Sequence, residues 1–341
     1  MSAAVLREAI LIGIGAGLTL YVLLGGADFG GGFWDLLAHG PSRERERDLI
    51  SAAIGPVWEA NHVWLIFVVT ALFAAFPAAF AALGVGLYLP FSLAVLGIVL
   101  RGAAFAFRAH GDRGSRWQRS WTRIFGIASL VTPVVLGMSA AAISAGRIRV
   151  HAGVVDAGIV ASWTGPLSLV SGALSLAMCA YLAATYLAVE AVQRRDAGLL
   201  ELFRIRAIAS GAAAGTFAAV GLLAIRADAP ILWDGMTRKA WPLVILSASG
   251  GVASMVATLR RRPTHARAFA AVAVASVVAG WGIAQAPYLI VPDVTAASAA
   301  APVPSLRAVA IGYAIGTCLL VPSLVLLFRL FTASRVAPTV P

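Results

Sequence analysis

The chain has 341 residues, of which 60% are hydrophobic and only 12% are charged, with a mean hydropathy of +0.89. Soluble domains carry about twice that share of charged residues, so this composition excludes a soluble globular enzyme and predicts a polytopic membrane protein. The formal net charge of +11 would suggest nucleic-acid binding in a soluble chain. Here the arginines fall in short runs between apolar segments, a pattern that indicates membrane topology and no nucleic-acid partner.

Nine apolar stretches are each long enough for a helix that crosses a bilayer core, which takes about 20 residues. In chain order they are residues 5–37, 50–76, 79–107, 118–145, 162–191, 203–226, 239–259, 266–288 and 305–332. The first stretch lacks a small-residue cleavage site, so we expect it to remain as a span. No connection is long enough for a soluble domain, and the fold class predicted is an all-α membrane protein with nine transmembrane helices.

The distribution of Lys and Arg predicts the orientation of these spans. The connections after the first, third, fifth and seventh stretches carry SRERERD, RAHGDRGSRWQR, QRRDAGLLELFRIR and RRRPTHAR, and the C-terminus adds Arg329 and Arg335. The other connections hold far fewer cations. By the positive-inside rule, the arginine-rich side is cytoplasmic, the N-terminus lies outside and the C-terminus is cytoplasmic.

Ionisable side chains inside spans are expensive, which makes each of them a candidate for function. The spans contain Asp28, Asp35, Glu59, His62, Arg101 and Glu190. Counted from the cytoplasmic ends of their spans, Asp28 and Glu59 both lie about nine residues in, roughly 13 Å deep, and Arg101 is within reach of the same layer. One arginine cannot pair with two acids, so we predict an acid that can transfer a proton. A structural ion pair of Arg101 with Asp28 or Glu59 is the alternative.

The residues around Glu59 give this segment further polar character. His62 follows Glu59 by three residues and is predicted to share its helix face, whereas Asn61 is predicted to lie on a different face. Trp58 and Trp64 flank the group. A lone histidine in a span is more often a packing residue than a metal ligand, and no second histidine or methionine lies at a matching depth. We therefore expect the chain to ligate no metal itself.

The segment LLGGADFGGGFWDLL surrounds Asp28 with glycines. Small residues let helices approach closely in lipid, and a flexible break that exposes carbonyl groups to a water-lined path is the other interpretation. Asp35 follows Asp28 by seven residues, so both face roughly the same way. The pattern predicts a line of carboxylates with Asp35 at its cytoplasmic mouth.

Three stretches in this order, GGADFGGGFWDLLA, IGPVWEANHVWLIFVVTALFAAFP and VLRGAAFAFR, all within residues 21–108, resemble subunit II of the cytochrome bd family of quinol oxidases. The rest of the chain is similar only in span count, length and loop polarity. The resemblance implies two four-helix bundles, residues 5–145 and 162–288, with a peripheral helix at 305–332. It also implies a heterodimer with a subunit I that holds two haems b, haem d and the quinol site, in the bacterial cytoplasmic (inner) membrane.

The resemblance further implies an activity and residue roles. The family's complex oxidises quinol and reduces dioxygen to water with protons drawn from the cytoplasm, and subunit II stabilises the complex, supplies protons and contributes to oxygen access. Glu59 falls at the family's acid of the proton route, Asp28 and Arg101 at its polar positions, and Trp64 at a position associated with oxygen. The family often has aspartate at position 59 and glutamine at position 62. No cofactor is expected on this chain; a quinone or lipid in an apolar groove and a small single-span accessory subunit are further expectations.

Two other functions are consistent with a polar cluster in a membrane bundle. A secondary transporter would bind its substrate near the midplane, but the second half of the chain lacks buried charges and shows no inverted repeat with matching broken helices. A purely structural subunit without a proton role is the second alternative.

Overall fold

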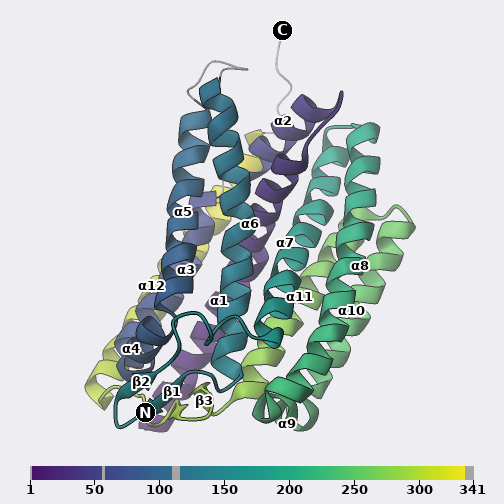
Figure 1. The fold of residues 1–341 in the computed structure, drawn as a ribbon. Helices are drawn as coiled ribbons and strands as arrows, with labels where there is room; N and C mark the ends of the chain where they lie inside the picture. The colour runs from purple at the N-terminus through teal and green to yellow at the C-terminus, as the bar shows by residue number, and fades with distance from the viewer. Residues whose placement is uncertain (1, 56–57, 110–115, 335–341) are drawn as a thin grey trace.

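The computed structural model describes residues 2–55, 58–109 and 116–334, and Figure 1 shows their arrangement as long, roughly aligned helices. The helices of these residues are α1 (Ala3–Leu37), α2 (Arg43–Ile54), α3 (Trp58–Ala75), α4 (Pro77–Gly86), α5 (Tyr88–Ala109), α6 (Arg116–Ser144), α7 (Pro166–Gln193), α8 (Ala197–Asp228), α9 (Pro230–Arg238), α10 (Trp241–Leu259), α11 (Pro263–Gln285) and α12 (Val303–Ser334). Four short strands form two antiparallel pairs, β1 (Arg149–His151) with β2 (Val154–Asp156), and β3 (Tyr288–Ile290) with β4 (Val294–Thr295).

The predicted all-α class and the number of spans are confirmed. Within the described residues, nine helices are long and apolar enough to cross a membrane: α1, α3, α5, α6, α7, α8, α10, α11 and α12. The orientation of these spans in a membrane stays a prediction. Residues 110–115 of the second arginine-rich connection, and Arg335, lie outside the described residues.

Two predicted span boundaries are wrong. The second span begins at Trp58 and not at residue 50, because residues 43–54 form the separate helix α2. The third begins at Tyr88 and not at residue 79, because Pro77 starts the short helix α4. Pro77 starts α4, since proline lacks a backbone N–H and is favoured at the first position of a helix, and α4 ends at Gly86 before α5 begins at Tyr88. Hydropathy alone did not separate these segments.

Helix α1 lies at the centre of the bundle and contacts α3, α6, α7, α11 and α12. It is one continuous helix through the glycine-rich segment, so the structure supports close packing and not a flexible break. A Cβ atom at Gly30 would lie 1.9 Å from the backbone oxygen of Cys179 in α7, and one at Gly32 would lie 2.1 Å from Ser129 Oγ in α6. Only glycine permits these approaches, which bring two neighbouring spans against α1.

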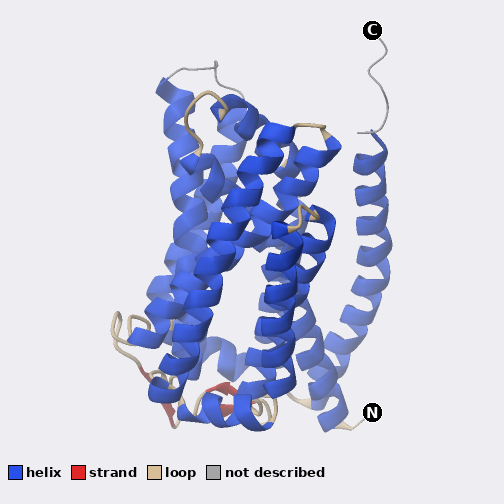
Figure 2. Cartoon of the chain, turned by 90° about the vertical axis from the view of Figure 1, so that its right-hand side faces the viewer, coloured by secondary structure: helices blue, strands red, loops and turns tan. Residues whose placement is uncertain are grey.

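Further contacts connect α5 with α6, α7 with α8, α10 with α11, and α7 with α11. Helix α12 packs on α1 and α3 at the edge of the bundle (Figure 2), where the Tyr313 hydroxyl donates to the Phe67 carbonyl at 2.9 Å. Helix α7 contacts both α1 and α6, and therefore joins the two predicted four-helix groups. The division into bundles at 5–145 and 162–288, with a peripheral helix at 305–332, stays a prediction.

The two strand pairs lie at one end of the molecule near α9, opposite α2 (Figure 1). Arg149 Nε donates to Asp293 Oδ2 at 2.8 Å, and the same oxygen accepts from the Val150 backbone N–H at 2.9 Å. These bonds join the β1–β2 hairpin to the β3–β4 connection. The hydrogen bond from Arg149 holds the pKa of Asp293 below its ordinary value.

Candidate functional site

The first polar cluster joins α1, α3 and α5 through Asp28, Asn61 and Arg101, all of which are buried. The Asn61 side-chain amide donates to Asp28 Oδ2 at 2.5 Å. The positive charge of Arg101 acts on Asp28 and on Tyr21. No ion pair shorter than 4.0 Å joins Arg101 to Asp28 among the described residues, so Asp28 has a hydrogen bond and a nearby charge but no direct counter-ion.

Several buried polar atoms around this cluster lack a partner within the described parts of the chain. They are Arg101 Nε and Nη2, Tyr21 Oη and Trp64 Nε1. The Arg101 guanidinium instead lies 5.0 Å from the ring centroid of Phe29 and 5.2 Å from that of Phe125, distances typical of cation–π contacts. Buried donors are ordinarily satisfied by ordered water or a further group. The cluster is therefore suited to hold water between α1, α3 and α5.

His62 lies between α1 and α3 in an aromatic environment. Its Nδ1 is 2.9 Å from the Trp58 carbonyl oxygen one turn earlier, so Nδ1 carries the proton of that bond. The ring contacts Tyr21, Phe29 and Trp58 at centroid distances of 6.1, 6.3 and 6.3 Å. The sequence predicted His62 as part of the polar cluster, and the structure brings it to the aromatic border of that cluster. Its second ring nitrogen is free of this backbone bond.

The predicted position of Glu59 is wrong in depth and in neighbours. Glu59 lies in the first turn of α3 and is exposed on the isolated chain, with no hydrogen bond or ion pair among the described residues. Asn61, expected on a different face from Glu59, does lie on a different face and is the α3 residue that contacts Asp28. Residues two apart on a helix point about 200° apart, so burying Asn61 turns Glu59 outward. The late start of α3 also removes the nine residues from which the depth of Glu59 was counted.

Asp35 forms a second buried site two turns further along α1. Its Oδ2 accepts from Arg108 Nη1 at 3.1 Å, and its Oδ1 lies 3.6 Å from Arg47 Nε. Arg47 also donates to the Asp35 carbonyl oxygen at 3.3 Å, and Arg108 donates to Ser51 Oγ at 3.1 Å. Asp35 thus fastens α2 and α5 to α1. The sequence predicted a line of carboxylates with Asp35 at its mouth, whereas in the structure both carboxylate oxygens of Asp35 lie near arginines.

The arginine partners of Asp35 were missed from the sequence, although one signal was present. Arg108 follows Arg101 by seven residues on α5, just as Asp35 follows Asp28 by seven on α1. Alternating spans make α1 and α5 run in the same direction, so equal steps bring both acid and arginine positions into register. Arg47 carried no such signal, because it lies on α2, which was not predicted as a separate helix.

Further ion pairs fix α2 on the bundle. Arg206 of α8 donates to Glu46 at 2.8 Å, with its guanidinium 5.0 Å from the ring centroid of Trp34. Arg45 pairs with Asp196, and this bond holds the pKa of the Asp196 carboxyl below its usual range. Ion pairs therefore join α2 to α1, to α8 and to the N-cap residue of α8.

Trp64 is partly buried against a small apolar cluster of Tyr21, Phe29 and Cys179. Within the residues that the structure describes, no three His, Cys, Asp or Glu side chains gather as a metal site. The expectation that haem resides on a partner chain stays a prediction.

Among the described residues, nine helices that are long and apolar enough to cross a membrane surround a buried, incompletely paired polar cluster, which is the architecture of a multi-pass membrane protein. Residues 6–331 match the family model described as cytochrome bd terminal oxidase subunit II, so the chain belongs to that family. This membership favours the oxidase subunit over the transporter.

Individual relatives agree with the family. The chain is 40% identical over 119 residues to the cytochrome bd ubiquinol oxidase subunit 2 of Bacillus subtilis, which covers 35% of this chain and 34% of that protein. It is 31% identical over 185 residues to the cytochrome bd-I ubiquinol oxidase subunit 2 of Escherichia coli, covering 53% and 47%. These aligned segments span about a third and about half of the relatives' lengths. The bd oxidase structure from Geobacillus thermodenitrificans has the same fold, with a TM-score of 0.74 and 24% identity over 95% of this chain and 98% of that one.

Proposed function

We propose that this chain is subunit II of a cytochrome bd-type quinol oxidase in the bacterial cytoplasmic membrane, where it pairs with a haem-bearing subunit I. The complex oxidises quinol and reduces dioxygen to water, and quinol binding and haem chemistry reside on subunit I. Family membership and the names of the relatives, both ubiquinol oxidase subunits, support this assignment. The observation that carries it is the exposed carboxyl group of Glu59 in the first turn of α3, a mainly apolar span.

The surroundings of Glu59 support a partner subunit on this face. Charged side chains within spans almost always face protein or a water-filled cavity, because hydrocarbon does not solvate them. Glu59, in the first turn of α3, has no hydrogen-bond or ion-pair partner within the described chain, and exposed apolar side chains such as Ile66, Phe73, Val95 and Val99 continue along α3 and α5. Subunit I docks on this face, covers Glu59 and is stabilised by the contact.

The proton role falls on the polar groups of α1 and α3. Asp28 and Glu59 carry protons from the arginine-rich side toward subunit I, His62 relays through its free ring nitrogen, and Arg101 fixes water with its unpaired donors. The missing partners of Arg101 and Tyr21 support a hydrated path through this cluster. The two arginines on Asp35 support an anchoring role for that acid. Trp64, packed in an apolar cluster, lines the approach of oxygen.

The test compares Glu59→Gln and Glu59→Asp in the purified complex. Gln keeps the size but not the carboxyl, so oxygen consumption with excess quinol falls several-fold while the haem absorbance per complex stays unchanged. Asp retains most of the turnover. Glu44→Gln, which removes an exposed acid of α2, is the matched control and keeps full activity.

Two results would contradict the proposal separately. Full turnover of the Glu59→Gln complex removes the proton role but leaves the oxidase assignment intact. Purification of the chain alone and colourless, without a haem-bearing partner, removes the assignment itself.

A further inference from the structure

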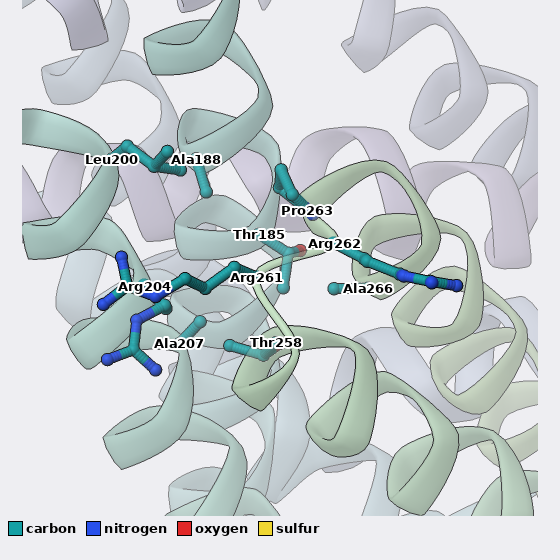
Figure 3. A pocket seen from close by; sticks show the side chains of 10 residues that line it. All are labelled: Thr185, Ala188, Leu200, Arg204, Ala207, Thr258, Arg261, Arg262, Pro263 and Ala266. Atoms are coloured by element: carbon teal, nitrogen blue, oxygen red, sulfur yellow. The ribbon is translucent and has the colours of Figure 1, made fainter. Parts of the chain in front are cut away.

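A small cavity lies outside the Asp28 cluster, between the ends of α7, α8, α10 and α11 on the arginine-rich side (Figure 3). It is lined by Thr185, Ala188, Leu200, Arg204, Ala207, Thr258, Arg261, Arg262, Pro263 and Ala266. None of these residues takes part in the proposed proton path. The cavity sits where four spans end, which is the level of lipid headgroups for helices of this length.

The charges at the cavity are unbalanced. Arg204 Nη2 donates to Glu201 Oε1 at 2.6 Å, and Arg261 Nη1 lies 3.0 Å from Glu201 Oε2, so two arginines share one carboxylate. Arg262 lines the same cavity and makes no ion pair within the described residues. The neighbouring Arg260 is exposed. The rim therefore carries an excess of positive charge.

The walls of the cavity offer almost no polar group to a solute. Ala188, Leu200 and Ala207 are apolar, and both threonine hydroxyls are already engaged. Thr185 donates to the Leu182 carbonyl at 2.8 Å and Thr258 donates to the Ser254 carbonyl at 2.9 Å. The site thus combines an apolar wall with a cationic rim. The first turn of α11, which contributes Pro263 and Ala266, adds the positive end of a helix dipole.

We propose that this cavity binds an anionic phospholipid, with the phosphate at Arg204 and Arg261, whose side chains point to the same side in Figure 3, and the glycerol end of an acyl chain against the alanine and leucine wall; Arg262 extends to the other side and adds positive charge to the rim. Basic pockets between transmembrane helices on the cytoplasmic side are a recurring form of anionic-lipid site. Exposed Ile205 follows Arg204 on α8, and exposed Val256 and Leu259 of α10 shortly precede Arg261 along the chain, where an acyl chain would run. The inference does not depend on the oxidase function.

A lipid fits this site better than a free phosphate ion. A small anion would gain only the arginine contacts, which salt screens at an exposed rim. A phospholipid also buries apolar surface against the wall and remains concentrated at this depth by the bilayer. The occupant is therefore a membrane lipid with an acidic headgroup, and inorganic phosphate becomes a control.

The experiment uses the full chain, purified in detergent with the subunits that accompany it and stripped of native lipid. Its thermal unfolding is followed while phosphatidylglycerol, phosphatidylcholine or inorganic phosphate is added. Phosphatidylglycerol should raise the unfolding temperature at much lower concentration than phosphatidylcholine. In the double variant Arg261→Gln with Arg262→Gln, the phosphatidylglycerol affinity falls roughly 25-fold, about fivefold for each charge.

The matched control is Arg194→Gln with Arg195→Gln. These exposed arginines lie at the end of α7 on the same side of the bundle, outside the cavity, and Arg195 has the same left-handed backbone conformation as Arg261, with φ of 55° and 57°. The control removes the same net charge and the same residue types, so it keeps near-normal lipid affinity.

Glu201→Gln gives a result of opposite sign, because it frees Arg204 and Arg261 from their carboxylate and strengthens phosphatidylglycerol binding. This second variant keeps the test decisive if the arginine variant is poorly folded. Equal affinity of the cavity and control variants overturns the proposal. So does an equal response to phosphatidylcholine, or full stabilisation by inorganic phosphate alone.

Discussion

Asp28 and Asp35 are the same residue type on the same helix, seven residues apart and both buried, yet their surroundings differ. Both oxygens of Asp35 face an arginine, from α5 and from α2. Asp28 has one amide hydrogen bond, and Arg101 nearby without a direct ion pair among the described residues. Buried carboxylates on one helix therefore differ in role: Asp35 is held by two arginines, whereas Asp28 lies in a cluster with unpaired donors.

The difference arises from position along α1. Asp35 lies near the arginine-rich end, where α2 folds back and brings Arg47 beside it. Asp28 lies two turns further into the span, where its polar neighbours are Asn61 of α3 and Arg101 of α5. Ion pairs near the interface fasten elements together, whereas a lone polar cluster deeper in a span is the usual mark of a pathway. The same substitution, Asp to Asn, should therefore have different effects on stability and on turnover at Asp28 and at Asp35.

The largest effect is expected from Asp35→Asn. Removing this charge leaves Arg47 and Arg108 facing a neutral group at a buried site, and breaking a buried ion pair from one side costs about 3–5 kcal/mol. The purified complex should unfold at a much lower temperature, while the surviving folded fraction keeps its turnover. The same substitution at Asp28 is the control and should cost far less stability; equal losses at the two positions would contradict the distinction.

Gly30 lies between the two acids on α1, and a substitution there tests how strongly the close packing of α1 on α7 stabilises the bundle that holds them. Gly30→Ala places a Cβ atom against the backbone oxygen of Cys179, 1.9 Å away, and α7 must move since a backbone atom has no rotamer to adopt. Overpacking of this kind costs about 1–3 kcal/mol. Gly15→Ala, where no atom lies within 4 Å, should instead be neutral or slightly stabilising. Comparing the unfolding temperatures of the two variants measures the contact directly.

The sequence predicted the nine spans and the burial of Asp28 and Arg101, because hydropathy and the cost of charge in lipid are local properties. It did not predict which α3 residue meets Asp28, since that depends on how α3 is rotated about its axis against α1. In the structure Asn61 takes the inward position, and the start of α3 at Trp58 leaves Glu59 at the helix entrance.

The ion pairs of α2 were also beyond the reach of the sequence. Glu46 meets Arg206 across 160 residues of chain, and Arg45 meets Asp196 across 151. From the sequence alone, the charged residues of α2 are expected to face lipid headgroups or water. Their pairing with Arg206 and Asp196 arises only because the tertiary fold places α8 beside α2. Pairings of this kind follow from packing and not from periodicity.

Asp28→Asn should separate function from stability. Asparagine keeps the shape and a hydrogen bond to Asn61 but cannot carry a proton, so oxygen consumption of the complex should fall roughly tenfold, which corresponds to about 1.4 kcal/mol in activation free energy. The haem absorbance should not change, and the unfolding temperature should change less than in Asp35→Asn. Normal turnover would place Asp28 with Asp35 as a structural acid and remove the functional half of the comparison.

The smallest effect is expected outside the membrane, where Arg149 and Asp293 repeat the arginine–aspartate bond of Asp35 at an exposed site. The hydrogen bond from Arg149 lowers the pKa of Asp293, so the charged form is favoured in the folded state. The resulting stability is present above the ordinary carboxyl pKa of 3.8 and disappears as the pH falls through the lowered value. Asp293→Asn should therefore unfold slightly earlier than the unmodified chain at neutral pH, and the two should converge in acid.

Salt distinguishes this exposed pair from the buried one. Water and ions screen Arg149, so added salt should reduce the small difference at neutral pH. The loss in Asp35→Asn should persist in the same salt, because no solvent reaches that carboxylate. If salt abolished both differences equally, the Asp35 site would be hydrated, and the two carboxylates of α1 would differ in depth alone.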